Sequence, residues 1–141
     1  MSFTYFGRIA CGIAGVNSLV MGAYHLYLPY QFEWRTFTDS IPEMIQWGIF
    51  AINFDMSLLM LILGIIGLTI TKNWGQHHST QRVSLGLIAA FWVMHATYLA
   101  INPMPIPAFL GWLKILLTIF AAGIASLSCI AFFAYRQSIH Q

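Results

Sequence analysis

The sequence predicts an all-α integral membrane protein, a four-helix transmembrane bundle whose helices run up-down-up-down. Hydrophobic residues make up 59% of the 141-residue chain and charged residues only 7%, whereas a soluble domain has about 25% charged residues. Four apolar segments approach or exceed the length of about 20 residues that a transmembrane helix needs. Polar or proline-containing stretches separate them. This composition excludes a soluble domain, a disordered chain, a disulfide scaffold and a nucleic-acid-binding protein.

The predicted spans belong to one integral membrane domain over residues 1–141. They are Phe6–Leu28, Pro42–Ile70, Val83–Ile101 and Phe109–Tyr135. Pro29 is expected to close the first span, because proline cannot donate the helical hydrogen bond. The segment Ser40-Ile41-Pro42-Glu43 reads as a capping box and predicts the start of the second span. The prolines within residues 102–107 predict a stiff, extended loop before the fourth span.

The loop charges predict the orientation. In a four-span protein both termini and the middle loop share one side, which here carries Arg8, Lys72, Arg82 and Arg136. The other side carries Arg35 together with Glu33, Asp39 and Glu43. Because basic residues concentrate in cytoplasmic loops, we expect a bacterial inner-membrane protein with both termini in the cytoplasm.

Residues 29–41 form a predicted outer aromatic segment. Tyr30, Phe32, Trp34 and Phe37 are interspersed with polar residues, as in the aromatic belt at a membrane interface. Both a headgroup anchor and a lid over an outward-facing cavity fit this pattern.

The ionisable residues within the spans are predicted to lie in the outer half of the bundle. His25 and Lys114 lie roughly 5–8 Å, His95 about 10 Å and Asp55 about 18 Å below the outer boundary, counted along the helices. Such residues cost about 2.5–3.5 kcal/mol each to place in a bilayer and are therefore candidates for function.

Small and polar residues predict which faces point inward. Ala10, Ala14, Ser18 and Gly22 form a stripe on the first span, the kind of surface through which membrane helices pack. Asn53 and Asp55 lie about 200° apart around the second span, so they cannot serve one site. One of them is expected to face another helix pair or another subunit. Asn102, at the end of the third span, is a further polar candidate.

Two histidines on separate spans at similar depth suggest a haem b bound between helices. His25 and His95 would be the axial ligands, and Ser18 and Gly22 would leave room for the flat ring. Trp92 and Tyr98, with Phe91, would pack against its faces, and Arg35 or Lys114 would meet its propionates. The role would be electron transfer, with a quinone or another small lipophilic ligand as partner, or haem handling.

Two other functions remain open. A non-catalytic subunit or assembly factor, in a homo-oligomer or a larger membrane complex, would use the small-residue stripes and the spare polar group for helix contacts. A metal-ion or proton pathway would use His25, His95, Asp55 and Glu43, while His77-His78 is more typical of a solvated loop. The sequence shows no nucleophile–base pair and no phosphate-binding glycine loop, so a stand-alone enzyme is not expected.

Overall fold

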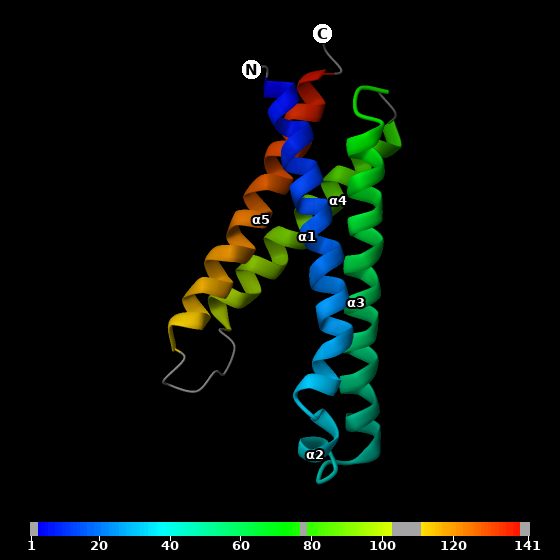
Figure 1. Cartoon of the computed structure of the whole chain (residues 1–141), viewed down its shortest axis with the longest axis vertical. Coiled ribbons are helices and arrows are strands. Elements are labelled where there is room, and N and C mark those ends of the chain that lie inside the picture. The colour runs from blue at the N-terminus through cyan, green and yellow to red at the C-terminus, as the bar shows by residue number, and fades with distance from the viewer. Residues whose placement is uncertain (1–2, 77–78, 103–110, 139–141) are drawn as a thin grey trace. The chain divides into compact units, whose positions relative to one another are not determined.

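The computed structural model describes residues 3–76, 79–102 and 111–138, and the regular structure in these ranges is all α-helical (Figure 1). The helices are α1 (Phe3–Gln31), α2 (Trp34–Thr38), α3 (Glu43–Lys72), α4 (Ser79–Ile101) and α5 (Gly111–Ser138). All except α2 are long and apolar enough to cross a membrane. The all-α class and the four candidate membrane helices therefore agree with the sequence prediction.

The helix ends differ from the predicted spans in one instructive place. Helix α1 contains Pro29 and continues to Gln31, so the prediction that this proline closes the first span is wrong. Helix α3 begins at Glu43, one residue from the predicted start, and the Pro42 carbonyl accepts a hydrogen bond from the amide of Gln46 at 3.1 Å. The predicted proline-rich loop and the His77-His78 pair fall largely or wholly outside the described residues.

Contacts divide the chain into two compact units. The first, which we call the hairpin unit, is Gly15–Ile66 and comprises most of α1, all of α2 and most of α3. The second, which we call the α4–α5 unit, combines residues 1–14 with residues 67–141. Helices α1 and α3 therefore contribute to both units.

In the hairpin unit, α1 and α3 pack side by side through glycines (Figure 1). A Cβ atom built on Gly22 would lie 2.9 Å from the carbonyl oxygen of Ser57 and 3.0 Å from the amide nitrogen of Leu61. A Cβ atom on Gly64 would lie 2.9 Å from the carbonyl oxygen of Gly15. Each helix thus presents a glycine where the other backbone comes closest, which is how small residues let membrane helices approach.

The small-residue stripe predicted for α1 is buried along its length. Ala10, Ala14 and Ser18 are at most 2% exposed, and Gly22 is buried as well. This confirms the prediction that the stripe packs against other helices.

In the α4–α5 unit, one face of α4 packs against α5. On α4 the buried residues are Leu85, Ile88, Ala89 and Trp92, at the three- and four-residue spacing of a single helix face. On α5, Tyr135 is fully buried, donates its hydroxyl to Oε1 of Gln81 at 2.6 Å, and meets the Trp74 ring edge-on at 5.3 Å. Polar and aromatic contacts thus join the end of α5 to the α3–α4 connection.

The start of α1 is tied to the end of α3 in the same unit. Arg8 donates from Nε to the carbonyl of Thr71 at 3.0 Å. Cys11 donates from Sγ to the carbonyl of Gly67 at 3.3 Å. The last carbonyls of a helix have no intrahelical partner, so Arg8 satisfies one of them with a positive charge, which the helix dipole favours.

Candidate functional site

Pro29 and Asn53 together shape the α2 end of the hairpin unit. Because proline has no N–H, the carbonyl of His25, four residues earlier, loses its helical donor. Asn53 on α3 replaces that donor, since its Nδ2 donates to the His25 carbonyl at 2.9 Å. Membrane helices tolerate proline where a neighbouring side chain satisfies the freed carbonyl. This explains why α1 continues past the proline to Gln31.

A tight turn after α1 brings α2 back against α3. Glu33 adopts a left-handed backbone conformation with φ 45° and ψ 48°, which costs a non-glycine residue roughly 1–2 kcal/mol. Two contacts fix α2 in place. Gln46 donates from Nε2 to Oγ1 of Thr38 at 3.0 Å, and the Trp34 and Phe50 rings lie 6.0 Å apart between centroids. The backbone strain at Glu33 is thus held by contacts on the following helix.

The predicted outer aromatic segment has two faces. Thr38 is buried and Trp34 is half-buried against α3, whereas Tyr30, Phe32 and Phe37 are exposed. Exposed aromatic rings are typical of the membrane interface. The segment therefore combines exposed rings suited to an anchor with residues that pack against α3.

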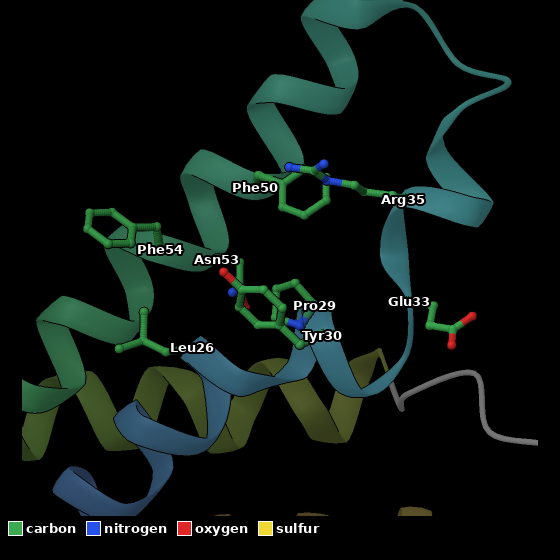
Figure 2. Close-up of a pocket in the computed structure, with 8 residues that line it drawn as sticks. All are labelled: Leu26, Pro29, Tyr30, Glu33, Arg35, Phe50, Asn53 and Phe54. Atoms are coloured by element: carbon green, nitrogen blue, oxygen red, sulfur yellow. The ribbon is translucent and has the colours of Figure 1, made fainter.

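A cleft of about 770 Å³ lies among α1, α2 and α3 at this end of the hairpin unit (Figure 2). Its walls are mainly apolar and aromatic, with one amide, one guanidinium and one carboxylate among the side chains. The lining residues are Leu26, Pro29, Tyr30, Glu33, Arg35, Phe50, Asn53 and Phe54. Small-molecule sites measure about 300–1,000 Å³ and combine apolar walls with a few polar groups. The cleft has this size and this lining.

The side chains of the two charged residues of the cleft, Arg35 and Glu33, point in different directions. In Figure 2, Arg35 extends from α2 toward Phe50 on α3, whereas the carboxylate of Glu33 points away from the other lining side chains. Within the described part of the chain, neither side chain forms an ion pair. The cleft therefore presents a positive charge that no neighbouring carboxylate neutralises.

The two predicted haem ligands belong to different units. His25 is half-buried in the hairpin unit, where its backbone carbonyl accepts a hydrogen bond from Asn53 and its ring meets Tyr24 edge-on at 6.5 Å. His95 is half-buried on α4, where its ring stacks on Phe91 with centroids 6.1 Å apart and meets Trp92 edge-on at 5.6 Å. His95 thus contacts two of the aromatic residues, Phe91 and Trp92, that were expected to pack against the haem.

The other predicted site residues are spread over three helices. Tyr98 and Asn102 at the end of α4 are exposed, and Lys114 on α5 is half-buried. On α3, Asn53 faces α1, whereas Asp55 is exposed. The expectation that these last two residues serve different surfaces agrees with this placement.

One part of the haem hypothesis needs correction. Ser18 and Gly22 were expected to leave room for a flat ring beside His25, but α3 fills that space. The Gly22 Cα faces the backbone of Ser57 and Leu61 so closely that even an added methyl group would lie within 3.0 Å of it. Small residues here bring two helices together instead of opening a cavity. Nor do three or more His, Cys, Asp or Glu side chains gather as a metal site among the described residues.

The polar residues of the cleft were predictable from the sequence, whereas most of its apolar walls were not. Arg35 and Asn53 were candidates from the start, whereas Leu26, Phe50 and Phe54 were not. Leucine and phenylalanine occur throughout the spans, so their residue type gives no indication of a site. A proline four residues after His25, followed by an asparagine on the next span, was the available indication.

Comparison with protein families, curated proteins and solved structures gives no match for this chain.

Proposed function

We propose that this chain is an integral membrane protein that binds a small lipophilic ligand, such as a quinone, in the cleft of the hairpin unit. The cleft is the observation that carries the proposal. Leu26, Phe50 and Phe54 offer apolar walls for the body of a ligand. Arg35 and Asn53 offer the few polar groups that fix its orientation. Electron transfer is the role that such a ligand would serve.

Filling the cleft tests this function. Leu26→Trp adds bulk to its wall, whereas Leu59→Trp makes the same exchange at a position of α3 that does not line the cleft and is 40% exposed. Native mass spectrometry of the detergent-purified protein, incubated with a short-chain ubiquinone, counts the bound adducts. We expect the cleft variant to lose the adduct and the control to keep it. Equal binding by both variants would refute the proposal.

We further propose an up-down-up-down arrangement in a bacterial inner membrane, with both termini in the cytoplasm and the cleft on the opposite side. Arg8, Lys72, Arg82 and Arg136 support this orientation through the positive-inside rule. Two reporters fused to the C-terminus, one active only in the cytoplasm and one active only outside it, test on which side of the membrane this terminus lies. A reporter that signals from outside the cytoplasm would overturn the orientation.

Haem b ligation by His25 and His95 is a second candidate. The half-buried His95 ring, stacked on Phe91 at 6.1 Å and edge-on to Trp92 at 5.6 Å, favours it, because aromatic side chains of this kind pack against a macrocycle. The absorption spectrum of the purified protein decides. A Soret band that His25→Ala and His95→Ala each abolish is the expected result. No band, even after haem addition, would eliminate this candidate.

Asp55 supports two other roles, that of a non-catalytic subunit and that of a component of a proton pathway. This carboxylate is exposed on α3 about 18 Å along the helix from Glu43, a depth at which ionisable side chains commonly serve a helix contact or a proton relay. Blue native electrophoresis of wild type and Asp55→Asn tests the subunit role. A larger complex that the substitution dissociates is expected, and an unchanged monomer in both would contradict it.

A further inference from the structure

Arg35 is the only Lys or Arg in the hairpin unit, and it lines the cleft. Of the four acidic residues of the chain, only Glu33 lines the cleft as well, and its carboxylate points away from the other lining side chains (Figure 2). A guanidinium stays charged at any physiological pH and offers five N–H donors that match a carboxylate or a phosphate. The charge of this exposed cleft residue is therefore available to a ligand.

The apolar part of the cleft extends from Arg35 along α3. Phe50 and Phe54 lie about 10 Å and 16 Å along the helix from Glu43, at about 1.5 Å per residue. Leu26 on α1 lines the same cleft. Phe54 is 52% exposed, so this wall of the cleft continues onto the outer surface of the hairpin unit. An elongated molecule can thus lie along the helices with one end beside the guanidinium.

The backbone that carries Arg35 is already held against α3, and the exposed guanidinium is accessible to such a molecule. No ion pair within the described residues has to break. Helix α2 is already fixed by the hydrogen bond from Gln46 to Thr38 and by the contact between the Trp34 and Phe50 rings. A fixed backbone reduces the entropy lost on binding, because only the Arg35 side chain then has to be ordered.

From these three observations we infer that the ligand of the cleft is an anionic amphiphile. Its carboxylate or phosphate binds Arg35, and its hydrocarbon part lies along Phe50 and Phe54. This inference rests on the proposed function and goes further by naming the chemistry of the ligand's head. The head belongs either to a free lipophilic acid or to a phospholipid of the bilayer, and the two sources share the same recognition by the guanidinium.

Paired probes that differ only in charge test the inference. Oleate is compared with oleyl alcohol, and phosphatidylglycerol with phosphatidylcholine, by native mass spectrometry of the detergent-purified full chain. The variants are Arg35→Gln, which removes the charge, and Arg35→Lys, which keeps it. Arg136→Gln is the matched control, because this arginine is exposed near the end of α5 and lies outside the cleft.

We expect the wild-type protein to prefer one anionic probe over its neutral partner by about tenfold or more, the usual strength of a hydrogen bond to a charged group. Arg35→Gln should bring this ratio to about one without weakening the neutral probe, while Arg35→Lys and Arg136→Gln keep most of it. Preference for oleate alone assigns the head to a free acid, and preference for phosphatidylglycerol assigns it to a lipid. Both results support the inference.

Two results would overturn the inference that the ligand is an anionic amphiphile. Either the wild-type protein binds each anionic probe no better than its neutral partner, or the preference survives in Arg35→Gln. The Leu26→Trp variant separates this failure from failure of the proposed function. If the cleft-filled variant loses both neutral and anionic probes, lipophile binding in the cleft stands and only the charge assignment falls. If the wild type binds none of the probes, both fall.

Discussion

Replacing Asn53 by leucine should destabilise the hairpin unit through the carbonyl of His25. The asparagine donates to that carbonyl at 2.9 Å, and Pro29 has no N–H that could take its place. An unsatisfied buried polar group costs about 1–3 kcal/mol. Measured hydrogen bonds between membrane helices average about 0.6 kcal/mol and reach about 1.7 kcal/mol. We therefore expect Asn53→Leu to lower the free energy of unfolding by about 1–2 kcal/mol.

The proline provides the internal control for this prediction. Pro29→Ala restores an N–H at position 29, which can donate to the His25 carbonyl as in any regular helix. In this background the carbonyl no longer depends on α3. The cost of Asn53→Leu should then fall below about 0.5 kcal/mol, as for a substitution that leaves no buried group without a partner. The two substitutions are thus expected to be coupled by about 1 kcal/mol.

Reversible unfolding in mixed detergent micelles, followed by circular dichroism, measures the four free energies of this double-mutant cycle. Equal helix content in the folded variants shows that each still forms α1 and α3. If Asn53→Leu costs the same with and without Pro29, the asparagine does not replace the missing backbone donor, and our explanation for the continuation of α1 is wrong.

Three further predictions use the same unfolding measurement. Gly22→Ala should be less stable than Gly48→Ala by about 1–3 kcal/mol, the cost of overpacking, because nothing lies within 4 Å of a Cβ on Gly48. Both exchanges change the helix propensity equally, so equal stabilities would contradict the close contact between Gly22 and α3. Glu33→Gly should raise stability by about 1 kcal/mol at most, because glycine adopts the left-handed conformation freely, and a loss of stability would show that the side chain is needed there. Asp55→Leu should lower stability by no more than about 0.5 kcal/mol, because this exposed side chain has no contact among the described residues that would be lost. A loss above about 1 kcal/mol would reveal a buried partner.

The positions of the long helices were predictable from the sequence. A run of about 20 apolar residues is by itself a strong indication of a membrane helix. The end of α1 was not predictable in this way. The rule that proline stops a helix considers only hydrogen bonds within that helix. Here the decisive donor is Asn53, which lies 24 positions after Pro29 and on another helix. A local rule cannot include that partner.

The candidate site was predictable only in its polar part. Arg35 and Asn53 stand out in an apolar sequence because charged and amide side chains are costly in a bilayer. The residues that give the cleft its shape do not stand out, because Phe50 and Phe54 resemble many lipid-facing residues. The meaning of Gly22 was also ambiguous. A small residue opens space only where no neighbour moves in, and here α3 does.

The glycine contacts of the hairpin unit also bear on the order of assembly during synthesis. The residues that carry them, from Gly15 to Gly64, are complete before α4 and α5 have been made, and segments generally fold from the N-terminus as they emerge. The contact between Gly7 on α1 and Ala134 on α5 can form only when the chain is nearly finished. Helix α1 is therefore expected to join α3 early and α5 late, so that a ribosome stalled after α3 presents a hairpin that already contains the complete cleft.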